Sequence, residues 1–227
     1  MSGRLKDYLL PLGLLLLGTI AIAATNGDLR LSSRFYIGHG WPVGDLPLWR
    51  FLYRIDRFPA ALLGIGGLLL ASYGCYRPAW ADWKRSGVFL ALLVILGPGL
   101  LVNNVFKEYW GRPRPREITQ FDGTKPFLHP WQKGISHQGR SFPSGHSSAA
   151  FAMTAPYFIY RRTHRRRALA WLTGGLAFGI LMSVARIAQG GHFLSDCLWA
   201  WGMVHLTAVV LHHLMGLDRD AGSPGSA

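Results

Sequence analysis

Long apolar runs alternate with polar segments along the chain, and this pattern predicts membrane-spanning helices. A helix needs about 20 apolar residues to cross a bilayer, with a range of about 17 to 25. Six runs reach or approach that length, and the fourth is the weakest because its first turn is polar. They cover residues 8–24, 58–76, 87–106, 144–160, 168–185 and 194–214. We therefore predict an all-α fold, a polytopic bundle of six transmembrane helices.

The same pattern divides the chain into three parts. We expect residues 1–57 to hold the first transmembrane helix and an outer amphipathic segment. Residues 58–217 would form the core with the other five helices, and residues 218–227 a flexible tail.

The outer segment mixes apolar side chains from Leu46 to Phe58 with Arg50, Arg54 and Arg57. This pattern suits a short helix lying on the membrane interface. An ordinary helix packed on the bundle through its apolar side fits the pattern equally well.

The first apolar run also resembles a secretory signal peptide. Arg4 and Lys6 precede a leucine-rich stretch, and the sequence Ala-Ile-Ala-Ala follows at 21–24. Five more apolar runs come after it, whereas a signal peptide normally precedes a soluble domain. We therefore expect the first run to be retained as a helix.

The composition agrees with a membrane protein that has cationic loops. Of 227 residues, 50% are hydrophobic and 15% are charged, against about 25% charged in an average soluble domain. The net charge of +13 would otherwise suggest nucleic acid as a partner. Here the basic residues lie mainly between apolar runs, without a basic stripe interleaved with aromatics, so we expect no nucleic-acid partner.

The basic residues also predict an orientation. Residues 161–167 contain five arginines, and such clusters stay on the cytoplasmic side. With six spans, both termini would then be cytoplasmic. Segments 25–57, 107–143 and 186–193 would face outward.

Three polar clusters stand at the outward ends of the runs. The first is the stretch 107–115, the second is the Pro-Ser-Gly-His sequence at 143–146, and the third combines Arg186, His192 and Asp196. By the count of spans, all three clusters fall on the same face of the membrane, which an alternating topology does not require. We therefore expect them to meet in one site.

The second cluster has the features of an anion site. Ser144 and Gly145 open a helical run, where free backbone N–H groups and the positive helix end attract negative charge. Ser144 would cap the helix and His146 would lie in its first turn. A plain helix cap with a solvated histidine remains the alternative.

In the third cluster, His192 and Asp196 are four residues apart and would share one face of a helix. A carboxylate that accepts the proton of one imidazole nitrogen fixes the tautomer and leaves the other nitrogen nucleophilic. Asp196 is also the one acidic residue inside a predicted span, which marks it as a functional candidate. A structural His–Asp pair at a helix end is the alternative.

Lys107, Arg114 and Arg186 could surround a single anion, as a phosphoryl group requires. For Arg112 and Arg116 we expect contacts with lipid headgroups instead. Three permanent cations beside the histidines would repel a divalent ion. We therefore expect neither a metal nor another cofactor.

These motifs resemble those of the type-2 phosphatidic-acid phosphatase superfamily. Its signature is a Lys, six residues and Arg-Pro, then Pro-Ser-Gly-His, then Ser-Arg, five residues, His, three residues and Asp. The chain matches it from Lys107 to Asp196, except that Ala185 stands at the serine before Arg186. This departure removes at most one hydrogen bond to phosphate. The resemblance covers roughly residues 60–214.

The resemblance implies a six-helix, metal-independent phosphohydrolase. His192 would attack phosphorus and form a phosphohistidine, with Asp196 orienting it. His146 would protonate the leaving group and later activate water. The oxygens of the phosphate would be held by Lys107, Arg114, Ser144, the Gly145 N–H and Arg186.

The stretches 186–196 and 142–146 look similar to those of bacterial lipid A phosphatases. Phosphatases of phosphatidylglycerophosphate, phosphatidic acid and undecaprenyl pyrophosphate share the same core motifs. A lipid phosphotransferase and a transporter of anionic lipids are further alternatives. We expect a phosphorylated membrane lipid as the substrate, at the periplasmic face of a bacterial inner membrane.

Overall fold

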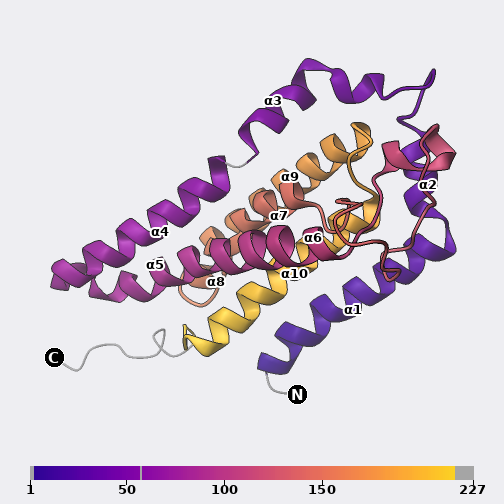
Figure 1. Ribbon diagram of the computed structural model, residues 1–227. Coiled ribbons are helices and arrows are strands. Elements are labelled where there is room, and N and C mark those ends of the chain that lie inside the picture. The colour runs from indigo at the N-terminus through magenta and orange to yellow at the C-terminus, as the bar shows by residue number, and fades with distance from the viewer. Residues whose placement is uncertain (1–2, 57, 218–227) are drawn as a thin grey trace.

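The computed structural model of the protein describes residues 3–56 and 58–217 as a bundle of helices (Figure 1). This part of the chain contains two isolated β-bridges and no strand, so the all-α prediction is confirmed. The expected tail, residues 218–227, lies outside the described residues. The long helices are α1 (Gly3–Ala24), α4 (Phe58–Tyr76), α5 (Ala81–Val94), α9 (Arg165–Ala188) and α10 (Leu194–Leu214).

Shorter helical elements connect and extend them. α5 continues through a π-helical stretch, Ile95–Phe106, into α6 (Lys107–Tyr109). The other short α-helices are α2 (Gly27–Ser33), α3 (Pro47–Ile55), α7 (Gly145–Phe151) and α8 (Ala155–Tyr160). Turns of 3-10 helix occupy Pro42–Asp45, Pro78–Trp80, Pro115–Glu117, Thr119–Phe121 and Ala152–Thr154.

Among the described residues, five helices are long and apolar enough to cross a membrane. They contain α1, α4, α9, α10 and the continuous stretch from α5 to α6. Large apolar side chains on their outer faces are more than 60% exposed, as in helices that face lipid. Examples are Leu10, Leu17, Leu62 and Leu69. The chain is therefore a multi-pass membrane protein, although the expected count of six helices is not confirmed.

The fourth expected span differs because it is broken. In place of one helix over 144–160, α7 and α8 are joined by the 3-10 turn Ala152–Thr154. Pro156 lies in the first turn of α8 and cannot donate to the preceding turn. Thr154 Oγ1 also donates to the Phe151 carbonyl at 2.8 Å, a contact that bends helices. The 16 residues from 145 to 160 span about 24 Å at the α-helical rise.

Two contacts show which helix ends lie together. At one end of the bundle, Asp7 in α1 accepts from Arg161 after α8 at 2.8 Å and lies 3.0 Å from His213 Nε2 in α10. Helix polarity then puts the C-terminal ends of α1, α6 and α9 at the other end, together with the N-terminal ends of α7 and α10 (Figure 1). The segment 110–144 folds over that second end.

Close packing of α1 against α10 brings the N-terminal part of the chain to this second end. Leu15 lies against Gly202, and Leu198 lies against Gly18, where a side chain would collide. Trp199 Nε1 donates to Thr19 Oγ1 at 3.1 Å. α2, which follows α1, therefore lies beside the first turn of α10.

The amphipathic element of the outer segment is α3. It buries Leu52 against Ala150, Met182 and Ala185 and exposes Leu48 and Phe51. One side of α3 thus packs on the bundle, as the second of the two interpretations expects. Its position relative to a membrane interface stays a prediction.

Candidate active site

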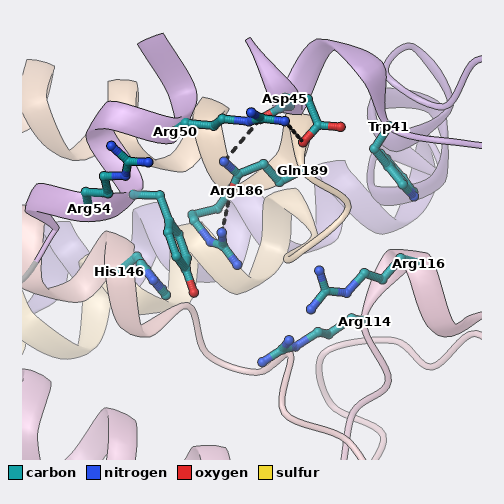
Figure 2. Close-up of a pocket in the computed structure, with 11 residues that line it drawn as sticks. Trp41, Asp45, Arg50, Arg54, Arg114, Arg116, His146, Arg186 and Gln189 are labelled. Carbon is teal, nitrogen blue, oxygen red and sulfur yellow. Dashed lines mark hydrogen bonds and ion pairs between the residues drawn. The ribbon is translucent and has the colours of Figure 1, made fainter. Parts of the chain in front are cut away.

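The three polar clusters converge at one end of the bundle around a cavity of about 500 Å³. Arg114, His146 and Arg186 line this cavity, one from each cluster (Figure 2). The rings of His146 and His192 lie 6.4 Å apart, centre to centre. A side chain at Gly145 would touch Lys107 Nζ at 2.8 Å, so the lysine lies against the start of α7.

His192 is oriented by the backbone and is fully buried. Its Nδ1 lies 2.6 Å from the Ser141 carbonyl, and a carbonyl only accepts, so Nδ1 carries the proton. Nε2 is then the unprotonated nitrogen. It is buried and has no hydrogen-bond partner among the described residues.

Burial also keeps His192 neutral. Desolvation is the main cause that lowers the pKa of His192 from 6.5 to about 3, and nearby Lys107 and Arg186 add to it. The Asp196 carboxylate opposes this shift. At neutral pH the ring therefore presents a free lone pair on Nε2.

Asp196 contacts His192 through Ser141 and not directly. The Asp196 Oδ2 to His192 Nδ1 distance of 3.8 Å is too long for a hydrogen bond. Oδ2 accepts instead from Ser141 Oγ at 2.6 Å and from the Phe193 N–H at 2.7 Å. Ser141 thus bridges the two residues, since its hydroxyl binds Asp196 and its carbonyl binds His192. The direct pair that we expected from their spacing is replaced by this bridge.

Arg112 balances the charge of Asp196, which corrects the expectation that it reaches lipid headgroups. Its guanidinium is fully buried and lies over the Phe193 ring at 4.5 Å. Nη1 donates to Asp196 Oδ1 at 2.5 Å, and Nη2 donates to Asp28 Oδ2 at 2.8 Å. Asp28 in turn accepts from the Ser195 N–H at 2.8 Å. A buried guanidinium therefore joins α2 to the first turn of α10.

His146 faces a carboxylate from a different part of the chain. Its Nε2 lies 3.1 Å from Asp56 Oδ2, and both side chains are largely buried. The Tyr53 ring stacks on His146 at 5.0 Å with an angle of 21° between the planes. Tyr53 in α3 and Asp56 at the C-terminal end of that helix thus fix the ring of His146.

Ser144 caps α7 as expected. Its Oγ accepts from the Ser147 N–H at 3.4 Å and lies 2.8 Å from Ser147 Oγ. The Ser144 N–H donates to the Asp196 carbonyl at 3.1 Å, which ties α7 to α10. The Pro-Ser-Gly-His cluster is therefore held next to the His192 cluster by the backbone.

The cations differ in burial. Arg186 and Lys107 are buried and Arg114 is half-buried. Burial lowers the pKa of Arg114, and the charge of Arg116 lowers it further. The Nε atoms of Arg114 and Arg186 are buried and have no hydrogen-bond partner within residues 3–56 and 58–217. Donors of this kind are suited to an anion that enters the cavity.

The part of the chain that the structure describes contains no group of three or more His, Cys, Asp or Glu side chains arranged to hold a metal ion. His146 and His192 each have a carboxylate nearby, Asp56 and Asp196. The two pairs do not form a common ligand set.

The sequence alone did not identify four residues that complete the site: Asp28, Asp56, Arg112 and Ser141. Asp28 and Arg112 are 84 residues apart, and nothing in the local pattern links them. Ser141 precedes the Pro-Ser-Gly-His motif by two positions, and its role depends on its carbonyl, which every residue has. For Asp56, the one available signal was an acidic residue among apolar and basic neighbours.

Comparison with known proteins gives one family and several relatives. The family model of the PAP2 superfamily matches residues 88–220. A lipid A 4'-phosphatase of Francisella tularensis subsp. novicida is 36% identical over 196 residues, which are 84% of this chain and 86% of that protein.

Two further relatives match a shorter region. A lipid A 4'-phosphatase of Rhizobium leguminosarum is 34% identical over 133 residues, 56% of this chain and 55% of the relative. A phosphatidylglycerophosphatase B of Bacillus subtilis is 26% identical over 133 residues, which are again 56% of this chain and 55% of the relative. No solved structure gives a significant match.

The position of Arg112 between two buried carboxylates predicts a large loss of stability on its removal. Replacing Arg112 by Met leaves Asp28 and Asp196 buried without their cation, which should cost about 3–5 kcal/mol. Denaturant unfolding of the detergent-solubilised protein measures this, with exposed Arg116→Met as the matched control. Adding Asp28→Asn to Arg112→Met should restore part of the loss. Equal stability of the two single variants would contradict the assigned role.

Proposed function

The chain belongs to the PAP2 superfamily, and on this premise we propose that it hydrolyses a phosphate ester on a membrane lipid without a metal ion. The observation that carries the proposal is the state of His192. Its Nε2 is neutral, buried and unpartnered among the described residues, and it lies next to His146 in a site rich in cations. A nucleophile in such surroundings is suited to attack phosphorus.

In the first step the lone pair of His192 Nε2 attacks phosphorus in line with the ester oxygen. The P–N bond forms as the P–O bond breaks, and the bonding electrons go to the departing lipid oxygen. His146 donates a proton to that oxygen, with Asp56 at 3.1 Å holding its ring. The product is a phosphohistidine and a free lipid alcohol.

In the second step His146, now a neutral imidazole, accepts a proton from water. The hydroxide oxygen attacks phosphorus, the P–N bond breaks, and its electrons return to Nε2. His192 is neutral again because Nδ1 keeps its proton on the Ser141 carbonyl throughout. One histidine therefore serves as the nucleophile and the other as acid and then base.

The charge on the transferred phosphoryl group is balanced by protein cations. Lys107, Arg114 and Arg186 supply three positive charges, and the Ser144 hydroxyl and Gly145 N–H supply further donors. Phosphoryl transfer depends mainly on positioning and on charge stabilisation. This set of groups provides both positioning and charge stabilisation. Residues 58–217 would form the phosphatase core.

The substrate best supported is lipid A or a related glycolipid. The relative that matches 84% of this chain is a lipid A 4'-phosphatase. The B. subtilis phosphatidylglycerophosphatase B matches 56% of it at lower identity. Phosphatidylglycerophosphate, phosphatidic acid and undecaprenyl pyrophosphate are therefore the competing substrates.

The proposed setting is a bacterial inner membrane with the cavity toward the periplasm. The arginines of residues 161–167 follow α8, at the bundle end where Asp7 contacts Arg161 and His213. The cavity lies at the opposite end. By the rule that basic loops stay inside, the described chain ends at residues 3 and 217 would be cytoplasmic.

The function is tested by phosphate release in the presence of EDTA. The purified protein in detergent is given lipid A, phosphatidylglycerophosphate, phosphatidic acid and undecaprenyl pyrophosphate in turn. We expect release from at least one of them, fastest from lipid A, and none from the His192→Ala variant. Full activity in that variant would rule out His192 as the nucleophile. Loss of activity on adding EDTA would rule out the metal-independent mechanism.

The two roles of His146 predict a distinct defect in His146→Ala. With 4-nitrophenyl phosphate the leaving group needs no proton, so the variant should still form the phosphohistidine. Without a base the intermediate should persist, giving a burst of about one nitrophenol per protein and slow turnover. Stopped-flow absorbance measures the burst, with His192→Ala as a control that gives none. Steady turnover without a burst would exclude His146 as the base of the second step.

A further inference from the structure

The cavity holds more positive charge than one phosphate group requires. Its lining includes five arginines, at positions 50, 54, 114, 116 and 186, and a single carboxylate, Asp45, among the described residues. Arg114 and Arg186, together with Lys107, already belong to the proposed phosphate site. Arg50, Arg54 and Arg116, which we call the outer arginines, have no task in the reaction.

The cavity is also larger than one phosphate. Its volume of about 500 Å³ lies in the range of about 300–1,000 Å³ found for pockets that hold a complete small molecule. By the proposed function, the cleaved phosphate would occupy the part next to His146 and Arg186. The remaining space lies between α3 and the 3-10 turn Pro115–Glu117, where the outer arginines are (Figure 2).

The backbone that carries Arg50 and Arg54 is held in place by contacts with the end of α9. Gln189 at the end of α9 donates through Nε2 to the carbonyls of Gly44 and Trp49 at 3.3 and 3.4 Å. A side chain at Gly44 would lie 2.6 Å from the Ala188 carbonyl oxygen, so the two segments are in close contact. Arg50 and Arg54 follow on α3, four residues apart and thus on one face. Figure 2 shows both above Arg186, across the cavity from Arg114 and Arg116.

Arg116 is anchored from the other side. Its backbone N–H donates to the Gly190 carbonyl at 3.2 Å, and its charge lowers the pKa of Arg114. Within residues 3–56 and 58–217, neither Arg54 nor Arg116 forms an ion pair with a carboxylate. The Arg50–Asp45 pair is exposed and long, at 3.4 Å, and such pairs contribute little. Mutual repulsion of these cations would be relieved by a second anion.

We propose that Arg50, Arg54 and Arg116 bind a second anionic group of the same lipid headgroup, beside the phosphate that is removed. The inference rests on the proposed function and narrows its substrate to lipids with at least two anionic groups. Guanidinium groups bind phosphate oxygens through paired hydrogen bonds. The second group would orient the headgroup so that the first phosphate meets His192.

A spacer series of diphosphonates tests this directly. These compounds are not hydrolysed and carry two anionic groups at a set separation, whereas methylphosphonate carries one. Inhibition constants are measured in neutral detergent for methylphosphonate and for alkane-diphosphonates with one to about six carbons. At the best spacer length we expect the diphosphonate to inhibit at least about tenfold more strongly than methylphosphonate. That spacer length reports the separation of the two anion sites.

The variant is the triple substitution Arg50→Gln, Arg54→Gln and Arg116→Gln. We expect it to reduce the ratio of the two inhibition constants to within about threefold. The matched control is Arg166→Gln, an exposed arginine in the first turn of α9 at the opposite end of the bundle. It should keep the ratio of the wild-type protein. Retained inhibition by methylphosphonate shows that the triple variant is folded, and each single variant should reduce the ratio in part.

Other outcomes overturn the inference. If no diphosphonate exceeds methylphosphonate, the cavity holds one anion. If phosphatidylglycerol added to the micelles lowers KM in the wild type and not in the triple variant, without a diphosphonate gain, the outer arginines bind separate membrane lipids. Failure of the proposed function is distinguishable, because the wild type would then release phosphate from no lipid. In that case titration calorimetry with the same phosphonates still decides whether two anion sites exist.

Discussion

The buried guanidinium of Arg112 is the contact on which the site depends. It forms ion pairs with two buried carboxylates, Asp28 and Asp196, that come from opposite ends of the chain. Removing either charge from water costs several kcal/mol unless an opposite charge lies close by. The segment after α6, the start of α2 and the first turn of α10 must therefore come together or leave a charge unpaired. Their meeting point is the place where His192 is held.

Around this buried ion cluster the charges are divided in a way that favours an anionic substrate. The inner ion network is closed, because Asp196 is fully engaged by Arg112, Ser141 and the backbone of Phe193. The cavity beside it is lined by five arginines, and two of them, Arg114 and Arg186, have a buried Nε without a hydrogen-bond partner among the described residues. A headgroup with negative charge supplies what the cavity lacks. The same logic keeps His192 neutral, since burial and the nearby cations both disfavour its protonated form.

The sequence predicted the parts of this arrangement that are encoded locally. Apolar runs located α1, α4, α9 and α10, because lipid imposes a minimum length on a spanning helix. The pairing of Ser144 with α7 was predictable from the spacing within one turn. Contacts between distant segments were not. Asp28 with Arg112 and Asp56 with His146 depend on the packing of helices far apart in sequence. The sequence did not predict the break between α7 and α8, because Thr154 and Pro156 interrupt the helix within a run that stays apolar.

The proposed mechanism requires His192 to attack through Nε2, because Nδ1 donates to the Ser141 carbonyl. The most direct measurement traps the phosphorylated protein from a His146→Ala reaction and determines the phosphorylated nitrogen by 31P and 15N NMR. We expect phosphate on Nε2 of His192. Phosphate on Nδ1, on another residue, or on no residue at all would contradict it.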